Sequence, residues 1–179
     1  MKKLWLAAGM ASGLLMAAGS AWASPDVTLQ FTGKVSSETC KIGGVEQGGY
    51  THEVPLPPVG ASALAAKGAV AGLKPFELKF TGCTGSTVGV WFKPDLLSVD
   101  PLTGALRNQI AQGSNAQVQL LDGQQQPLNL VSIAPDDVQK VNVSDGDATL
   151  KFYAQYLAAE DNTSAGDVKA HVVLDMVFE

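Results

Sequence analysis

The residues best suited to covalent chemistry are two cysteines, Cys40 and Cys83, the only thiols in the 179-residue chain. In an oxidising compartment, an even pair of cysteines is most simply a disulfide. A metal site or a reactive thiol is disfavoured, because neither histidine lies near a cysteine in the sequence. A disulfide here would close a loop of 44 residues. The chain-entropy model gives about 4 kcal/mol of stabilisation for a loop of that size.

The only imidazole groups are those of His52 and His171. Neither stands in a recognisable motif with a serine, cysteine or carboxylate that it could activate. A catalytic centre needs a nucleophile or acid, a base and a group that orients them, and the sequence offers no such set. We therefore expect no enzymatic activity and no catalytic residues.

Three polar or glycine-rich stretches could be taken for ligand sites, but ordinary turns explain them better. Asp136-Asp137 and Asp145-Gly146-Asp147 could hold calcium, yet the pattern of a calcium loop is incomplete and aspartate is common in turns. The glycines of residues 43–49 lack the Lys-Ser/Thr ending of a phosphate-binding loop. We expect no cofactor and no metal site.

The first 23 residues have the pattern of a secretory signal peptide. Lys2 and Lys3 form a basic start, residues 4–18 form an apolar run, and Ala21-Trp22-Ala23 supplies the small-x-small cleavage pattern. The apolar run is shorter than a spanning helix requires. The mature chain would begin at Ser24 and keep 156 of the 179 residues, enough for one domain with a real core. Export also places both cysteines in an oxidising compartment.

Charge and hydropathy of the mature chain narrow the range of partners. Without Lys2 and Lys3, ten basic and seventeen acidic residues remain, a formal charge of about −7. Nucleic acid is therefore not an expected partner. No segment after Ala23 is long and apolar enough to predict a membrane-spanning helix.

Short alternating stretches separated by turn signals predict an antiparallel β-sandwich. The predicted strands contain Val35 to Ile42, Tyr50 to Leu56, Phe76 to Phe80, Val88 to Phe92, Val118 to Leu121, Leu128 to Leu130, Val138 to Val143, Leu150 to Tyr156, and Ala170 to Phe178. Residues 60–72 are rich in alanine and glycine and predict one short helix or a loop.

The two ends of the mature chain have complementary patterns. Residues 26–35 alternate as an amphipathic strand next to the cleavage point, and residues 170–178 form another alternating strand that ends near Glu179. The second strand should pair on both edges, but no later segment can supply its next neighbour. The N-terminal end of the mature chain therefore has an extra predicted strand, whereas the strand at the C-terminal end lacks a neighbour.

In this order, these residues resemble the chaperone–usher pilus subunits of the type 1 fimbrial pilin family over essentially the whole mature chain. The motifs that carry the resemblance are Val27-x-Leu29-x-Phe31-x-Gly33-x-Val35 followed by Cys40, Phe76-x-Leu78-x-Phe80-x-x-Cys83, and Phe152-x-Ala154-x-Tyr156 followed by Gly166, Ala170 and the C-terminal strand. One position departs from the pattern. Phe178 stands where the family usually has tyrosine, which keeps the ring and removes a hydroxyl.

The resemblance implies an incomplete immunoglobulin-like sandwich of six strands, one disulfide and an N-terminal donor strand. It divides the chain into a signal peptide (residues 1–23), a donor-strand arm (24–35) and a pilin domain (36–179). The implied donor residues are Val27, Leu29, Phe31, Gly33 and Val35. The implied acceptor groove, which a chaperone would also bind, contains Val172, Leu174, Met176 and Phe178.

The resemblance further implies a structural subunit of a surface fimbria that passes through the periplasm and supports adhesion. Its partners would be neighbouring subunits in a homopolymer, a periplasmic chaperone and an outer-membrane usher. The alternative is a minor adaptor or a tip adhesin. An adhesin would need a separate receptor-binding domain, for which 156 residues leave no room. Trp91 could stack on a sugar, but its place in a strand pattern favours packing.

Overall fold

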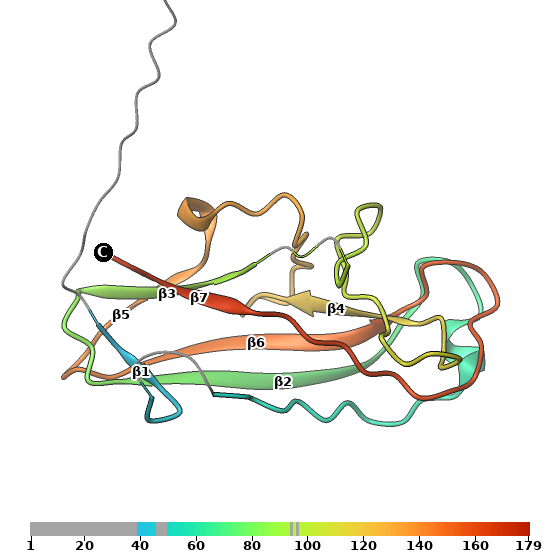
Figure 1. Ribbon diagram of the computed structural model, residues 1–179, viewed down its shortest axis with the longest axis horizontal. Helices are drawn as coiled ribbons and strands as arrows, with labels where there is room; N and C mark the ends of the chain where they lie inside the picture. Colours follow the sequence, from blue (N-terminus) through green and yellow to red (C-terminus); the bar gives the residue numbers. More distant parts are fainter. Residues whose placement is uncertain (1–38, 46–49, 94, 96) are drawn as a thin grey trace, which may run out of the picture. The chain divides into compact units, whose positions relative to one another are not determined.

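The computed structural model describes residues 39–45, 50–93, 95 and 97–179 (Figure 1). Within Val35–Glu179, the elements follow in the order β1 (Lys41–Ile42), η1 (Ala61–Leu64), β2 (Val70–Thr81), β3 (Thr87–Phe92), β4 (Gln117–Leu121), η2 (Pro135–Asp137), β5 (Lys140–Asn142), β6 (Ala148–Leu157) and β7 (Leu174–Phe178). The two η elements are short 3-10 helices. No helix in the described part of the chain is long and apolar enough to cross a membrane.

The strands form two antiparallel sheets, with the strand orders β1-β2-β6-β4 and β5-β3-β7. The longest pairing joins β2 to β6, from Val70 opposite Leu157 to Phe80 opposite Ala148. Its register shifts once, between Ala71 and Lys74, where Gly72 has a positive φ of 72°. The predicted all-β fold of two antiparallel sheets is confirmed.

Alternation along each strand explains why these sequences become half-buried strands. One face of each sheet supplies the side chains between the layers, and the main contributors are Leu78, Phe80, Val88, Val90, Phe92, Val118, Leu120, Leu150, Phe152 and Ala154. Phe92 and Phe152 meet edge to face across the two sheets, with ring centroids 5.2 Å apart. That geometry favours an aromatic pair beyond its buried area.

A disulfide joins Cys40 to Cys83, as the sequence predicted. Both cysteines are buried, so the bond ties the start of the sandwich to the end of β2 within the core. After it the chain turns at Gly43, whose φ is +58°. A Cβ atom at Gly43 would lie 2.2 Å from the Tyr50 ring, so glycine is required there on two grounds.

Three predicted strands differ from the structure. Residues 50–56 belong to no strand, and the C-terminal ladder begins at Leu174 instead of Ala170. Residues 128–130 form no strand either, although Leu128 donates its amide to the Leu120 carbonyl of β4 at 2.8 Å. In each case the sequence alternates, but alternation alone does not provide a neighbour to pair with. After β4 the chain turns at residues 122–126, where Asp122 donates its amide to the Gln126 carbonyl at 2.9 Å.

Candidate subunit-docking groove

Among the residues that the structure describes, the C-terminal strand β7 is paired along one edge only. It lies at the edge of its sheet, opposite β3, with Gly89 facing Val177 and Trp91 facing Asp175. Beyond the ladder, Thr87 donates its amide to the Glu179 carbonyl at 2.9 Å, and Lys93 donates its amide to the Val173 carbonyl at 2.8 Å. The hydrogen-bonding positions on this side are therefore the odd-numbered residues from Val173 to Glu179.

The even-numbered residues of β7 direct their main-chain groups to the other edge. In an antiparallel ladder, hydrogen-bonded and non-hydrogen-bonded pairs alternate, so the N–H and C=O groups of Leu174, Met176 and Phe178 point away from β3. Among the described residues, no strand borders that edge. It is a row of donors and acceptors ready for a further strand.

The same even-numbered residues turn apolar side chains toward the interior. The half-buried apolar residues of this row are Val168, Ala170, Val172, Leu174, Met176 and Phe178. They pack against the core cluster without being covered by it. The four groove residues predicted from the sequence, Val172 to Phe178, thus share one face of one edge. Their proposed role as an acceptor remains a prediction.

Leu56 and Phe76 are further half-buried apolar residues packed on the same core, and the sequence did not single them out as groove residues. Phe76 stacks on Phe152 at 5.7 Å, and the His52 ring lies 6.1 Å from Phe76. The alternating sequences around Leu56 and Phe76 predicted strands. Only the packing in the structure shows that the core leaves these two side chains partly uncovered. Among the described residues, no backbone hydrogen bond joins residues 50–59 to β7.

A hollow of about 590 Å³ adjoins Leu56 and Val168, two of these half-buried apolar residues. Residues 56–64 and residues 163–169 contribute most of its lining, and Tyr156 also lines it. Burial raises the pKa of the Tyr156 hydroxyl. The hydroxyl of Thr163, which also lines the hollow, is buried and has no hydrogen-bond partner among the described residues.

Asn108 fixes the chain where it enters the C-terminal strand. Its Nδ2 donates to the carbonyls of Ser114 at 2.7 Å and Asp167 at 2.8 Å. Its Oδ1 accepts from the amides of Ile110 at 3.1 Å and Lys169 at 2.9 Å. All four hydrogen-bonding positions of this side chain are therefore used. The approach is so close that a Cβ atom at Gly113 would lie 2.5 Å from the Asp167 carbonyl oxygen.

The acidic residues at the end of the chain form ion pairs on the paired side of β7 and do not belong to the apolar row. Lys93 pairs with Asp175 at 3.1 Å across the β3–β7 ladder, and Lys140 of β5 pairs with Glu179. The amide of Leu97 and the hydroxyl of Ser98 both donate to Asp95 and lower the pKa of its carboxyl group.

The structure places the other polar residues considered from the sequence on separate elements. His171 contacts the Gln109 side chain at 2.5 Å, and His52 contacts the Tyr50 hydroxyl at 3.2 Å. Trp91 is half-buried, and its Nε1 donates to the Ile133 carbonyl at 3.0 Å, as expected for packing. In the described part of the chain, no three His, Cys, Asp or Glu side chains gather as metal ligands would. The donor residues, 27 to 35, lie outside the described residues.

Known proteins resemble this chain in sequence and in fold. The profile of the family described as FimA, type-1 fimbrial protein, A, matches residues 56–179, from the region of the hollow through β7. The chain belongs to this type-1 fimbrial protein family. Among its relatives is the major fimbrial subunit SMF-1 of Stenotrophomonas maltophilia, 37% identical, with 92% of this chain and 99% of that protein covered.

A second relative, the F17 fimbrial protein of Escherichia coli, is also 37% identical, and the match covers 93% of this chain and 96% of that protein. A solved chaperone–usher pilus shares the fold, with a TM-score of 0.58 at 15% identity over 88% of this chain and 98% of that one. Membership of the fimbrial family makes this chain a structural component of a surface fimbria rather than a tip adhesin, and an exported protein.

Proposed function

We propose that this fimbrial subunit polymerises by strand addition, in which residues 24–35 of one copy fill the open edge beside β7 of the next copy. One observation carries the proposal. Leu174, Met176 and Phe178 of β7 have main-chain groups that no strand among the described residues pairs, and the same residues have half-buried apolar side chains. An added strand satisfies both at once. Because donor and acceptor are different surfaces, the contact does not close on itself and generates a filament.

The apolar residues of the arm recur at every second position, as do the inward-facing residues of β7. Inward-facing residues of an added antiparallel strand would stand opposite Leu174, Met176 and Phe178 and form the hydrogen-bonded pairs. Val27, Leu29, Phe31 and Val35 would then cover the apolar row, with Gly33 at a position where no side chain fits or where one would slow exchange. The intervening residues, such as Gln30, would face outward.

Before assembly, the open edge would be an aggregation hazard, because it combines apolar surface with unpaired main-chain groups. We propose that a periplasmic chaperone covers it and that an outer-membrane usher exchanges the chaperone for the arm of the next subunit. Relatives named as major fimbrial subunits support a shaft role, in which copies of this chain repeat as a homopolymer.

A complementation experiment tests the proposal. Phe31→Asp blocks the arm and leaves the groove, whereas Met176→Asp blocks the groove and leaves the arm. Neither variant alone should form polymer, and together they should form a capped dimer that survives SDS without heating and separates on boiling. Gln30→Asp, which changes an outward-facing arm residue, should polymerise normally. Polymer from Phe31→Asp alone, or no dimer from the mixture, would contradict the proposal.

A further inference from the structure

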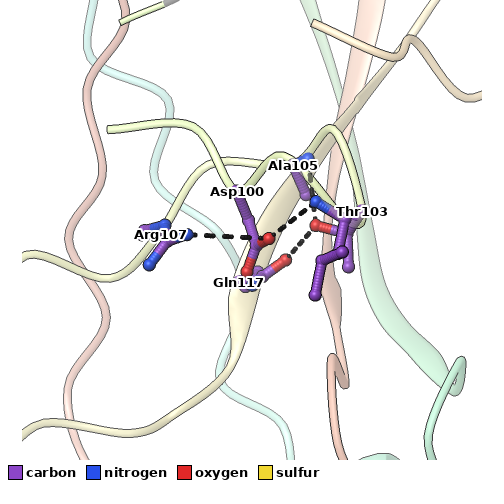
Figure 2. A network of polar contacts seen from close by, with 6 residues as sticks. Asp100, Thr103, Ala105, Arg107 and Gln117 are labelled. Carbon is purple, nitrogen blue, oxygen red and sulfur yellow. Dashed lines mark hydrogen bonds and ion pairs between the residues drawn. The ribbon is translucent and has the colours of Figure 1, made fainter. Parts of the chain in front are cut away.

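The loop after β3 contains a carboxylate, Asp95, that lacks the cationic partner its acidic neighbours have. Asp100, farther along the loop, lies 3.7 Å from the Arg107 guanidinium (Figure 2). The acidic residues at the end of the chain pair with Lys93 and Lys140. Among the residues that the structure describes, no lysine or arginine forms an ion pair with Asp95. This exposed carboxylate is therefore available to a cation from another molecule.

A chain of hydrogen bonds connects Asp95 to the segment that enters β7. The His171 Nδ1 atom contacts Gln109 Oε1 at 2.5 Å. Gln109 Nε2 donates to the Ser98 hydroxyl at 3.1 Å, and that hydroxyl donates to Asp95 at 2.9 Å. Ser98 is buried, and the Leu97 amide also donates to Asp95 at 3.1 Å. The carboxylate is thus held in a fixed position relative to His171.

Asp95 keeps both its charge and spare acceptor capacity. Hydrogen bonds from the Leu97 amide and the Ser98 hydroxyl lower the pKa of its carboxyl group, so the group is ionised at neutral pH. These bonds leave about half of the lone-pair positions of a carboxylate unused. The carboxylate borders a hollow of about 340 Å³, which we name the side hollow and which is lined by Lys93, Asp95, Ser98, His171, Val172 and Val173.

Apolar matching selects one register for the arm beside β7. With Val27 opposite Phe178, the inward-facing arm residues extend from Phe178 to Ala170 of the apolar row. A shift of two residues one way places Pro25 opposite Phe178, where an amide is needed and proline has none. The opposite shift places Ser37 opposite Ala170. Only the first register matches the whole stretch from Ala170 to Phe178 without a polar residue or a proline.

Charge selects the same register. Directly opposite side chains on one face of an antiparallel pair have Cβ atoms about 5 Å apart. The selected register places Lys34, an outward-facing arm residue, opposite His171 and beside the side hollow. The two shifted registers place Lys34 opposite Lys169, a like charge, or opposite Val173, whose carbonyl accepts the Lys93 amide. Only the selected register brings Lys34 next to the residue whose hydrogen bonds lead to the free carboxylate.

We infer that Lys34 of an incoming arm pairs with Asp95 of the acceptor copy and that this ion pair fixes the register of strand addition. The inference rests on the proposed function. The flexible four-carbon stem of lysine carries the ammonium group from a position opposite His171 into the side hollow, where Asp95 accepts it. An exposed ion pair adds little affinity by itself. It discriminates because a shifted arm loses the pair and meets a repulsive neighbour.

Cross-linking within the capped dimer measures the register. The acceptor is the Phe31→Asp chain that also carries Val173→Cys, because Val173 is exposed and belongs to no ion pair. The donor is the Met176→Asp chain with one cysteine in its arm. The native cysteines are bonded to each other, so the introduced thiols react with each other after mild oxidation.

Two outward-facing arm positions distinguish the registers. The selected register places Thr32 opposite Val173 at a non-hydrogen-bonded pair, whose Cα atoms, about 4.5 Å apart, lie within disulfide range. Thr32→Cys should therefore give dimers that survive boiling without reductant. Gln30→Cys is the matched control, since it stands opposite Val173 only in the register that sets Lys34 against Lys169, and it should give at least about tenfold less dimer. We call the quotient of the two yields the register ratio.

Charge reversal tests the ion pair itself. Lys34→Glu in the donor should lower the register ratio at least about threefold, because the reversed charge repels Asp95 and attracts Lys169. Asp95→Lys in the acceptor should restore the ratio. Glu77→Lys makes the same charge change at an exposed residue of β2 in the other sheet and should not restore it.

The outcomes separate the ion pair from strand addition. If no capped dimer forms, the proposed function fails and the ion pair fails with it. Capped dimers whose register ratio is unchanged by Lys34→Glu would overturn the ion pair and leave the proposed function intact. Restoration by Glu77→Lys as well as by Asp95→Lys would assign the effect to net charge and also overturn the pair. Lys34→Glu alters only the arm, so this comparison holds whatever Asp95→Lys does to the acceptor fold.

Discussion

The main-chain amide of Lys93 donates a hydrogen bond to the Val173 carbonyl at 2.8 Å, one residue beyond the end of the β3–β7 ladder. This bond continues the alternation of hydrogen-bonded and non-hydrogen-bonded pairs to the residue before Leu174, where the ladder begins. It places the main-chain groups of Val173 toward β3 and those of Val172 toward the open edge. Two adjacent valines thus belong to different surfaces, one half-buried in the apolar row and one exposed.

The first prediction uses this pair of valines. Val172→Asp should abolish the capped dimer described above when the variant serves as acceptor, because filling the groove would bury an unpaired carboxylate. A cost of about 3 kcal/mol would weaken arm binding roughly a hundredfold. Val173→Asp places the same charge in solvent and should leave dimer formation unchanged. Equal loss in both variants would mean that the alternation assigned to this segment is wrong.

The second prediction concerns Asn108. Its side chain makes four hydrogen bonds that join the loop of residues 108–114 to residues 167–169. Asn108→Ala should lower the free energy of unfolding of the purified chain by about 2–6 kcal/mol, at roughly 0.5–1.5 kcal/mol for each of the four bonds. Urea denaturation measures this change. Gln126→Ala, at an exposed turn position, is the control and should change stability by less than about 0.5 kcal/mol. A loss in Asn108→Ala no larger than the control's would contradict the assigned role.

The third prediction compares two neighbouring glycines that both have positive φ. A Cβ atom at Gly43 would collide with the Tyr50 ring, whereas a Cβ atom at Gly44 would meet nothing within 4 Å. Gly44→Ala should cost about 1 kcal/mol from backbone strain alone. Gly43→Ala should cost about 1–3 kcal/mol more, because the aromatic ring must move. Thermal unfolding of both variants checks the order, and equal melting temperatures would rule out the Tyr50 contact.

The fourth prediction concerns acid stability. Burial alone would raise the pKa of Asp100, but hydrogen bonds from the Leu102 amide and the Gln117 side chain, together with Arg107, hold the pKa below its usual value. A carboxyl group with a lowered folded-state pKa stabilises the fold above its unfolded pKa, about 3.9, and that stabilisation is lost as the pH falls through the folded pKa.

The free energy of unfolding should therefore fall as the pH drops below about 4, and Asp100→Asn should flatten that fall. Denaturation curves at several pH values measure the slope. Asp136→Asn, on the exposed η2 element, controls for the loss of one negative charge. A slope in Asp100→Asn as steep as in the parent chain would show that Asp100 does not carry the effect.

Side-chain alternation predicted most strands correctly because burial on one face leaves a period of two in the sequence. The strands at Phe76 to Phe80, Val88 to Phe92 and Leu150 to Tyr156 are confirmed within β2, β3 and β6. Residues 50–56 alternate just as clearly but pair with no strand in the described part of the chain. The pattern records which face a segment buries, whereas a ladder also needs a neighbour at the edge.

The sequence by itself determined the all-β class, the cysteine pair and the alternating apolar row that ends in Phe178, because these depend on local periodicity and residue type. Tertiary structure alone decided which edge of β7 is open and that Leu56 and Phe76 lie incompletely covered on the same core. These features arise between segments far apart in the chain, and their positions depend on packing, which no local pattern records.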